Sequence, residues 1–579
     1  MKSEKLIVRF FSILLILSSI NEIINSFCGA DQIKIKTKEL KFDKETSDKI
    51  MKKVTAASYT PIKIGMDYSN FKKPSSMDTT SFNTIKDVIE ETLTEFQKFL
   101  KIQHASIELN GAKDSIMSGC GLDSIDSGYS NFLINNDLIV FPSFSTELGQ
   151  NVLAAAAACL TYNMGSNKKR PVAGILYINQ NLAFDKLNTR LYMKNLLLHE
   201  ITHILIFHPD ILKDLGMTRT RNSITYVTSP QVLLKARQHF NCATITGIPL
   251  ENQGGEGSAG SHWESRYMLG DYMISTDYLD NVISDITIAL FEDSGIYSVE
   301  YFSGGLFKFG KNKGCSFLNN KCISNGVPIS EEFCTTPRQP MCTHSRTSKG
   351  FCAIYEYTST IPSDYQYFDN PYYGGFYPAN YCPVANYISS STDYYPSNCN
   401  AGTSTLHSDY GETMGSNSFC FLSSLLPTSS SQNSTYQSIC YRVRCNSSNK
   451  QIVVSVGSST VTCGTNGGNI TNPSGFTGVI TCPKYTDICD GEDNQLCNSA
   501  YDCLTNEVEA DDDSYDYDKT NNDLIKPEIL KILNTTSYVL TYSGPNNCVI
   551  KILLNPKPII QQIWITKNFI PHQFPLSQD

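Results

Sequence analysis

Hydrophobic residues recur with a helical period in several stretches of the chain. Between residues 80 and 102 the apolar positions are spaced three and four apart, which predicts an amphipathic helix. Residues 186–207 are apolar around almost the whole helix circumference, which is typical of a buried central helix. Further helices are predicted over residues 229–240 and 282–291.

Three other stretches have the pattern of β-strands. Residues 59–68 alternate apolar and polar side chains, and residues 138–141 and 172–178 are short apolar runs. The order strand, helix, strands, helix indicates an α+β fold. A chain of 579 residues is too long for one typical hydrophobic core, so we expect several domains.

The C-terminal half is rich in cysteine. Of the 20 Cys in the chain, 17 lie between Cys242 and Cys548. This density predicts a disulfide framework and an oxidising compartment. A zinc-binding Cys module is the alternative, but close C-x-x-C pairs are missing from the sequence. Cys120 and Cys159 stand apart from this group and are candidates for a pair.

The N-terminus has the features of a secretory signal. Lys2, Lys5 and Arg9 form a basic start, and residues 10–20 are an apolar run too short to span a membrane. We expect residues 1–28 to be a signal peptide. An uncleaved anchor is the alternative, and no other membrane association is indicated.

Composition indicates a polar arm after the signal and argues against a nucleic-acid partner. Residues 29–56 are polar and Lys-rich, as in a short pro-segment or N-terminal arm. Cleavage after Ala30 would remove Cys28 and leave an odd number of Cys. The net charge of −9 and the pI of about 5.6 argue against a nucleic-acid partner.

The C-terminal third divides by composition. Residues 306–505 are expected to form a Cys-rich, mainly β or irregular domain, residues 506–519 an acidic linker, and residues 520–579 a tail. The tail does not end in an apolar segment, which argues against a glycolipid anchor. Four Asn-x-Ser/Thr sequons fit a secreted glycoprotein. They begin at Asn433, Asn446, Asn469 and Asn534.

The predicted helix 186–207 carries the motif H-E-x-x-H, formed by His199, Glu200 and His203. Residues four apart are neighbours on one helix face, so the two imidazoles can reach one ion together. His nitrogens with one open position suit a catalytic zinc ion. The alternative is two satisfied core His residues, but unpaired imidazoles would be costly to bury in so apolar a helix.

Two later features bear on this site. His262 ends a glycine-rich segment, where a solvated His is common, and Met273 taken alone would be an ordinary core residue. Together with His199–His203 these positions resemble the leishmanolysin family of zinc metalloproteases, which are metzincins. The resemblance covers residues 55–490 and includes several motifs in order. They are His199-Glu-Ile-Thr-His203, Ala236-Arg-Gln-His-Phe-Asn-Cys242, Gly254-Gly-Glu-Gly-Ser-Ala-Gly-Ser-His262, Asp271-Tyr-Met273 and Gly314-Cys-Ser-Phe-Leu-Asn-Asn-Lys-Cys322.

The resemblance implies a site and a fold. It implies that His199, His203 and His262 bind one catalytic zinc ion, that Glu200 is the general base, and that Met273 lies in the turn beneath the metal. It implies a metzincin-like catalytic domain with a twisted mixed sheet. We expect that domain to consist of an N-terminal subdomain, 57–207, and a central subdomain, 208–305.

The sequence departs from the family at two places. Metzincins have Gly three residues after the second His, where this chain has Ile206, so we expect the turn near His208, Pro209 and Asp210. His208 is therefore an alternative third ligand. Family members carry an inhibitory Cys in the pro-segment, and Cys28, the candidate here, matches that pattern poorly.

The combined interpretation is a secreted or cell-surface zinc metalloendopeptidase that cleaves peptide and protein substrates. An extended substrate is expected to pair with a sheet edge above the active-site helix. Two alternatives remain: a catalytically degenerate, disulfide-rich surface or adhesion protein that keeps a metal site, and a zincin with an acidic third ligand such as Glu264.

Overall fold

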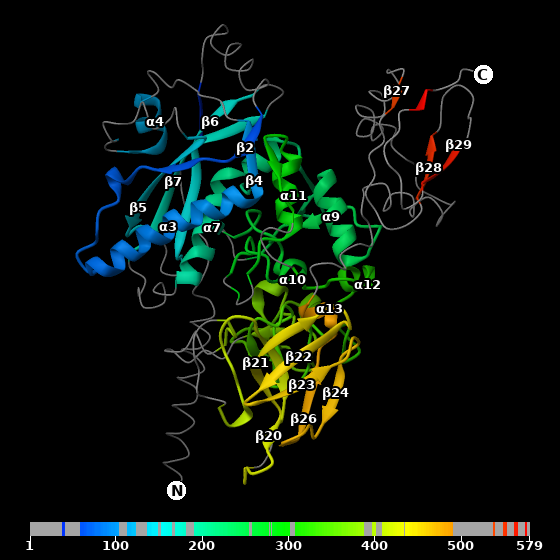
Figure 1. The fold of residues 1–579 in the computed structure, drawn as a ribbon. Coiled ribbons are helices and arrows are strands. Elements are labelled where there is room, and N and C mark those ends of the chain that lie inside the picture. The colour runs from blue at the N-terminus through cyan, green and yellow to red at the C-terminus, as the bar shows by residue number, and fades with distance from the viewer. Residues whose placement is uncertain are drawn as a thin grey trace. The chain divides into compact units, whose positions relative to one another are not determined.

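A computed structural model of the chain separates it into two compact units, Met1–Asn494 and Gln495–Asp579 (Figure 1). The first unit holds the predicted site and most of the described residues. In the second unit, the residues that the structure describes are the four short strands β27–β30. The structure describes residues 37–40, 58–103, 113–122, 125, 136–148, 152–164, 168–180, 190–253, 258–276, 278, 281–301, 307–386, 397–400, 408–432, 435–489, 537–538, 548–552, 561–565 and 574–575.

A five-stranded mixed sheet with the order β1-β6-β7-β5-β3 forms the frame of the N-terminal part. Strands β3, β5 and β7 run parallel to one another, β6 runs antiparallel to β7, and β1 pairs in parallel with the outer side of β6. The strands are β1 (Lys38–Leu40), β3 (Ile64–Met66), β5 (Leu138–Ser145), β6 (Ala154–Asn163) and β7 (Lys169–Asn179).

Helices cover both faces of this sheet. Helix α7 (Arg190–Leu205) packs on β6 and β7, with α3 (Thr79–Phe99) beside it, and α4 (Lys113–Cys120) lies on the opposite face (Figure 1). Side chains of β5 point alternately to the two faces of the sheet, because successive residues of a strand face opposite sides. Leu138 and Val140 face α7, whereas Ile139 packs with α4.

Strand β6 was not among the predicted elements. It begins with five Ala, residues 154–158, and Ala favours helices over strands. Burial of both faces between β7, α7 and α4 overrides that preference. The pairing of Cys120 in α4 with Cys159 in β6 is confirmed.

The first predicted strand and helix differ from the structure at their ends. The helix begins at Thr79, where the Asp78 side chain accepts the N–H of Ser81, and ends at Phe99. Residues Leu100–Gln103 are instead strand β4. The stretch 59–68 forms two strands in different sheets, because β2 (Tyr59–Pro61) pairs with β4 and β3 pairs with β5. The third strand beside β4 is β11 (Tyr297–Val299).

The central segment contains short helices and one small sheet. The predicted helix 229–240 is α9, which begins after Ser229, and the predicted helix 282–291 is α11, whose N-cap is Ser284. The two helices pack together, and the Asp293 carboxylate accepts the N–H groups of Gln231 and Val232 at the start of α9. The elements are α8 (Pro209–Asp214), β8 (Thr218–Arg221), β9 (Ile224–Val227), α9 (Pro230–Phe240), β10 (Ile248–Pro249), α10 (Ser265–Met268) and α11 (Asp285–Asp293).

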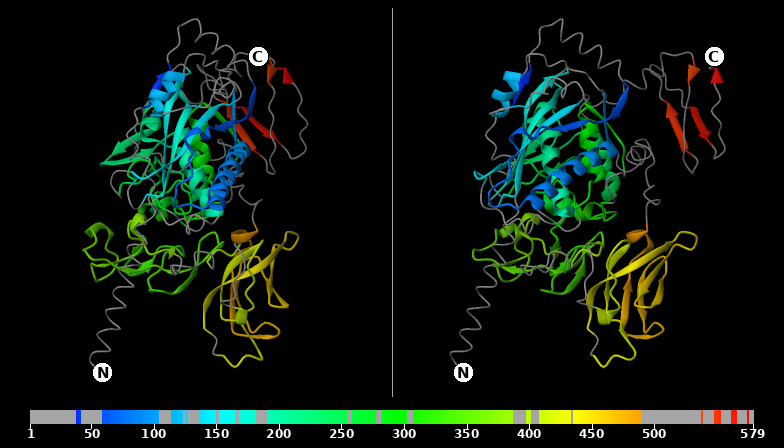
Figure 2. Two further views of the ribbon diagram at one scale, coloured as in Figure 1. Left: turned by 90° about the vertical axis from the view of Figure 1, so that its left-hand side faces the viewer. Right: turned by 60° about the vertical axis from the view of Figure 1, so that its left-hand side comes forward.

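The Cys-rich region follows with short strands and then a six-stranded antiparallel sheet of order β23-β22-β21-β19-β26-β24 (Figure 2). That sheet has its own core around Phe421, Ile439 and Tyr441. Its strands are β19 (Ser418–Ser423), β21 (Gln437–Asn446), β22 (Gln451–Val456), β23 (Ser459–Cys463), β24 (Gly468–Thr471) and β26 (Val479–Cys482).

Small strands and single helical turns complete this region. They are α12 (Cys315–Asn319), β12 (Ile323–Ser324), β13 (Val327–Pro328), β14 (Pro340–Cys342), β15 (Lys349–Cys352), β16 (Tyr355–Glu356), η3 (Ser363–Tyr365), β17 (Tyr373–Gly374), η4 (Tyr377–Ala379), β18 (Ala385–Asn386), η5 (Ser408–Tyr410), β20 (Leu426–Pro427), β25 (Phe476–Thr477) and α13 (Tyr485–Ile488).

Disulfides are frequent in this half, as predicted. The pairs are Cys242–Cys315, Cys322–Cys382, Cys334–Cys352, Cys342–Cys420, Cys399–Cys440, Cys445–Cys489 and Cys463–Cys482. They leave no place for the alternative Cys-based zinc module among these residues. Of the sequons, Asn446 is partly buried and Asn469 is exposed; Asn433 and Asn534 lie outside the described residues.

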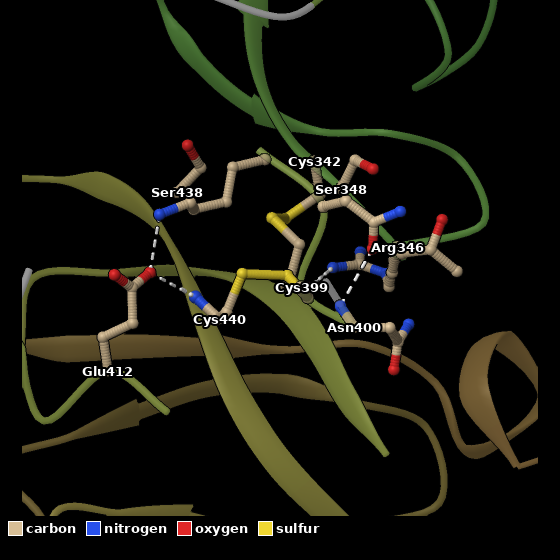
Figure 3. The surroundings of a disulfide bond; sticks show 12 residues. Cys342, Arg346, Ser348, Cys399, Asn400, Glu412, Ser438 and Cys440 are labelled. Atoms are coloured by element: carbon tan, nitrogen blue, oxygen red, sulfur yellow. Dashed lines mark hydrogen bonds and ion pairs between the residues drawn. A yellow bond between two sulfur atoms is a disulfide. The ribbon is translucent and has the colours of Figure 1, made fainter. Parts of the chain in front are cut away.

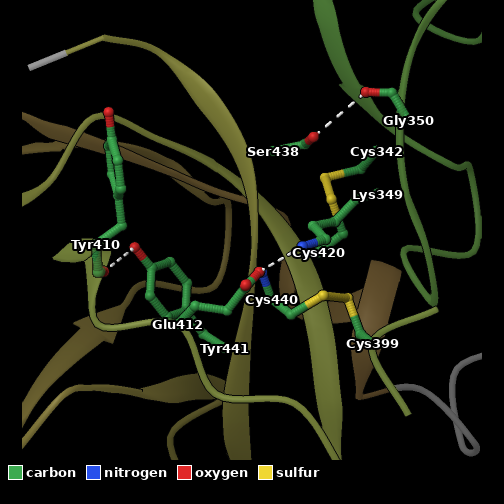
Figure 4. A network of polar contacts seen from close by, with 10 residues as sticks. All are labelled: Cys342, Lys349, Gly350, Cys399, Tyr410, Glu412, Cys420, Ser438, Cys440 and Tyr441. Carbon is green, nitrogen blue, oxygen red and sulfur yellow. Dashed lines mark hydrogen bonds and ion pairs between the residues drawn. A yellow bond between two sulfur atoms is a disulfide. The ribbon is translucent and has the colours of Figure 1, made fainter. Parts of the chain in front are cut away.

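Two of these disulfides flank a buried ion pair that joins β15 to the six-stranded sheet. Lys349 Nζ lies 2.7 Å from Glu412 Oε1, and the same carboxylate accepts the N–H of Cys440 (Figure 4). Nearby, Arg346 lies beside the Cys399–Cys440 bridge (Figure 3). Its guanidinium donates to the carbonyl of Cys420. The ion pair and the disulfides therefore hold together the same junction, between β15 and the six-stranded sheet.

The predicted terminal segments are described only in part. The expected signal peptide and Cys28 lie outside the described residues, and the expected N-terminal arm contributes β1 alone. The second unit contains two antiparallel pairs, β27 (Ser537–Tyr538) with β30 (Phe574–Pro575) and β28 (Cys548–Ile552) with β29 (Gln561–Ile565). In the described part of the chain, no helix is both long and apolar enough to cross a membrane.

Candidate metal centre

Three histidines converge at one point although they come from distant parts of the chain. His199 and His203 lie on α7, and His262 lies in the loop that precedes α10. The Nε2 atom of His199 is 3.0 Å from that of His203 and 3.1 Å from that of His262. Among the described residues, these three form the one cluster of His, Cys, Asp or Glu side chains that could hold a metal ion.

Each imidazole is held from behind by a backbone carbonyl. The Nδ1 of His199 lies 2.6 Å from the carbonyl oxygen of Tyr272, and that of His203 lies 2.6 Å from the carbonyl of Phe207. The Nδ1 of His262 lies 3.0 Å from the carbonyl of Ser258. Because a carbonyl only accepts, each Nδ1 carries the proton, and the three Nε2 lone pairs face one another.

The electrostatics of these rings favour a cation between them. Burial lowers the pKa of His199 to about 4 and that of His262 to about 3, and it holds the pKa of His203 well below its usual range. The rings are therefore neutral near pH 7. Neutral imidazoles with converging lone pairs and carbonyl-bound Nδ1 protons are the arrangement that His-bound metals use, so the residues present fit a metal ion.

Helix α7 presents the first two histidines and ends soon after them. Its last residue is Leu205, and the N–H groups of Ile206 and Phe207 both donate to the carbonyl of Thr202. Ile206 is fully buried and has no positive φ, so the turn here does not require Gly. This corrects the expectation that Ile206 moves the turn to residues 208–210.

His208 and Glu264 have other roles in the structure. His208 is the N-cap of α8, and its Nδ1 accepts the N–H of Asp210. Glu264 caps α10 by accepting the N–H of Arg266. Neither residue belongs to the cluster of three histidines.

The third histidine is placed by a turn around Met273. The N–H of Trp263 donates to the carbonyl of Met273, and the N–H of Met273 donates to the carboxylate of Asp271 at 2.7 Å. Asp271 also accepts the hydroxyl of Thr287, which in turn accepts the indole N–H of Trp263. All of these groups are buried, so the loop after His262 and the turn at Met273 form one hydrogen-bonded unit.

Glu200 lies on α7 between the two histidines of the motif. Its side chain is fully buried, as are His203 and His262, whereas His199 is 7% exposed. The cluster therefore opens to solvent on the His199 side. A carboxylate next to a buried cation site is suited to proton transfer.

Sequence reasoning missed the residues that hold the rings. Tyr272 contributes its carbonyl to His199 and its hydroxyl to Thr202, at 2.9 Å, in the middle of α7. The only signal was its position next to Met273. Phe207 and Ser258 act through their carbonyls, and a carbonyl leaves no trace in side-chain type.

The known proteins similar to this chain are leishmanolysins and their homologs. The sequence profile of the leishmanolysin peptidases matches residues 84–495. The chain is 28% identical to leishmanolysin of Leishmania tropica, over 63% of this chain and 56% of that protein. It is 27% identical to a leishmanolysin homolog of Crithidia fasciculata, over 72% and 65%. A leishmanolysin-like peptidase of Drosophila melanogaster is 34% identical over 28% of this chain and 26% of its own length. The matched part is less than two thirds of each of these relatives.

Proposed function

The chain belongs to the leishmanolysin family of peptidases, and from this membership we propose that it is a zinc-dependent endopeptidase. The observation that carries the proposal is the convergence of three neutral, carbonyl-oriented imidazoles, with a buried carboxylate on Glu200, the residue that follows His199 on α7. His199, His203 and His262 would hold the ion. When bound, zinc would polarise the scissile carbonyl and make a water molecule easier to deprotonate.

The protein's own groups would supply the remaining steps. Glu200 would accept a proton from the attacking water and deliver it to the leaving amine nitrogen. The carbonyls of Tyr272, Phe207 and Ser258 would keep the three Nδ1 atoms protonated, so that every Nε2 stays available as a ligand. Met273 would act by packing, through the turn that carries Tyr272.

The substrate would bind as an extended peptide along β6. Helix α7 packs under β6, and among the described strands β1 alone pairs with the side of β6 away from β7. The strand β1 pairs with Leu160–Tyr162 at the end of that edge. The pairing of β1 with this edge supports β-strand addition as the mode of substrate binding.

We further propose that the protein works outside the cytosol, as a secreted or cell-surface glycoprotein. Eight disulfides among the described residues support an oxidising compartment. The feature of the sequence that would favour the alternative, a degenerate adhesion protein, is Ile206 at the position where the family has Gly. That residue lies in the turn after α7 and leaves the three rings together, so it does not favour loss of activity.

The test is casein cleavage by purified protein, with and without a chelator, for the wild type and for Glu200→Gln. We expect cleavage that stops on chelation and returns with zinc. The Gln variant should bind one zinc ion per chain with at most about a hundredth of the activity, since general-base catalysis contributes roughly 100- to 10,000-fold. Zinc-loaded wild type with no chelator-sensitive cleavage would refute the proposal.

A further inference from the structure

Tyrosine is concentrated in one short segment of the Cys-rich region. Eight of the 32 Tyr in the chain lie between residues 355 and 381. Tyr381 is at their centre, with ring centroids 5.0 Å from Tyr357, 5.3 Å from Tyr377 and 6.1 Å from Tyr365. Tyr372 and Tyr373 are 40% and 37% exposed. We call these six residues the tyrosine platform.

The platform is rigidly built. Tyr381 has a φ of +58°, a conformation that costs energy for an aromatic residue, and its side chain packs on Gly374. A Cβ at Gly374 would lie 3.2 Å from that of Tyr381, so the ring could not pack so closely on any other residue. The Cys322–Cys382 disulfide anchors the next residue. Rings fixed before binding lose little entropy when a ligand arrives.

The platform lies beside the loop of the third histidine. Asn380 accepts a hydrogen bond from the side chain of Gln253, which belongs to the segment that leads to His262. The single turn η4, which holds Tyr377, contacts α10 directly after His262. The platform is therefore in contact with the segments that flank the third histidine in the chain.

The segment that carries the platform is negatively charged. Residues 351–386 include the exposed carboxylates of Glu356, Asp364 and Asp369 and contain no Lys or Arg. Behind the platform Arg266 is buried, and its guanidinium donates to backbone carbonyls of Phe317 and Asn320. Burial and nearby carboxylates, Glu264 and Asp364 among them, raise the pKa of Tyr365. Phenol rings with negative faces and exposed carboxylates together attract cations.

We propose that the tyrosine platform is an exosite for lysine- or arginine-bearing segments of extended polypeptide substrates. The cationic head groups would lie over the phenol rings and near the three carboxylates, while the backbone continues into the active site. This inference rests on the proposed peptidase function, because it names a feature of the substrate. It adds a second contact outside the three histidines and Glu200.

Direct binding tests the exosite without catalysis. The probes are fluorescein-labelled, lysine-rich peptides in a Gly/Ser background, with matched glutamate-rich and Gly/Ser peptides, titrated against the full chain carrying Glu200→Ala. Only the lysine-rich probe should bind, with an affinity that falls with salt. The combined variant Glu356→Gln, Asp364→Asn and Asp369→Asn should weaken binding roughly tenfold. The matched control is Glu91→Gln, which removes an exposed carboxylate on α3.

Cleavage tests whether the contact serves the substrate. Three fluorogenic peptides share one cleavable core. One has no tail, one carries a lysine-rich tail at its N-terminal end, and one carries the same tail at its C-terminal end. The ratio of kcat/KM for tailed over tail-less peptide should exceed one for the wild type and fall toward one for Tyr372→Ala/Tyr373→Ala. Tyr59→Ala, which removes a Tyr that is 43% exposed on β2, should keep the wild-type ratio.

Some results would overturn the inference. Equal binding of the lysine-rich and Gly/Ser probes would do so. Binding of a labelled N-glycan in place of the basic peptide would also do so, because the platform would then be a glycan site. A basic probe that binds a protein with no peptidase activity would refute the proposed function and leave the exosite standing. An active enzyme whose tailed-to-tail-less ratio is one refutes the exosite alone.

Discussion

The Nδ1 atom of His199 lies 2.6 Å from the carbonyl oxygen of Tyr272, 73 residues further along the chain. This contact joins the helix that carries the H-E-x-x-H motif to the turn that contains Met273. The hydroxyl of Tyr272 adds a second link, to Thr202 on the same helix. The turn thus fixes the orientation of a ring on α7, so the two halves of the site are one structure.

Removal of the proposed zinc ion should destabilise the protein measurably. A ligand present at about a thousand times its Kd stabilises the folded state by about 4 kcal/mol, and a chelator would remove that contribution. We expect the Tm to fall on chelation and to recover with zinc. Differential scanning calorimetry measures both.

Two histidine variants decide the ligand set. His262→Ala should lose bound zinc and show no change of Tm on chelation. His208→Ala should keep one zinc per chain and lose only about 1 kcal/mol of stability, because His208 caps α8. Metal analysis of both proteins gives the answer, and the reverse pattern would contradict the assignment of His262.

Much of the site was readable from sequence because its side chains are rare and their spacing is regular. His199, Glu200 and His203 share one helix, so their geometry follows from the helical repeat. His262 could be found only through the family resemblance, since no local pattern shows that a loop 59 residues away returns to α7. The disulfide-rich half was predicted from cysteine density, but not its pairing.

The rest could not be predicted because long-range packing decides it. The Ala run 154–158 reads as helix, yet it forms β6 between two covered faces. Ile206 reads as an obstacle to the turn, yet the turn forms without a positive φ. Residues that act through backbone carbonyls, such as Phe207, carry no signal at all.

Gly174→Ala should disturb α7. A Cβ at position 174 would lie 2.5 Å from Cγ2 of Ile204, well inside the 3.5–4.0 Å at which carbon atoms normally meet. Moving the helix should cost about 1–3 kcal/mol, and zinc affinity should fall because His203 precedes Ile204. Urea unfolding and zinc titration measure the two effects.

Gly119→Ala is the matched control for that substitution. Its Cβ would find its nearest atom, the carbonyl oxygen of Cys159, at 3.5 Å, which is an ordinary contact. We expect stability and zinc affinity close to those of the wild type. If Gly174→Ala behaves like Gly119→Ala, the close approach of α7 to β7 is not a requirement of the site.

Asp271→Asn should change how stability depends on pH. Burial raises the pKa of Asp271 from 3.8 to about 6, so the folded protein holds this proton more tightly than the unfolded chain. The free energy of unfolding of the wild type, measured relative to that of the Asn variant, should therefore fall by up to about 3 kcal/mol as the pH rises from about 4 to about 6. Above about pH 6 this difference should stay constant. Urea unfolding of both proteins in the presence of a chelator measures this difference. Titration of the histidines contributes equally to both proteins, so it does not affect the difference. A difference that grows with pH would mean that the carboxylate is stabilised in its charged form.

Lys349→Met should be strongly destabilising, because it leaves the charge of Glu412 buried. The two side chains are 9% and 0% exposed, and breaking such a pair costs about 3–5 kcal/mol. Adding Glu412→Gln should recover most of that loss, since no unpaired charge then remains. The comparison is Lys169→Met at the pair with Asp214, which has the same 2.7 Å separation but is 40% and 45% exposed. That change should cost less than about 1 kcal/mol. Equal losses in the two single variants, measured by urea unfolding, would mean that burial does not set the strength of the junction between β15 and the six-stranded sheet.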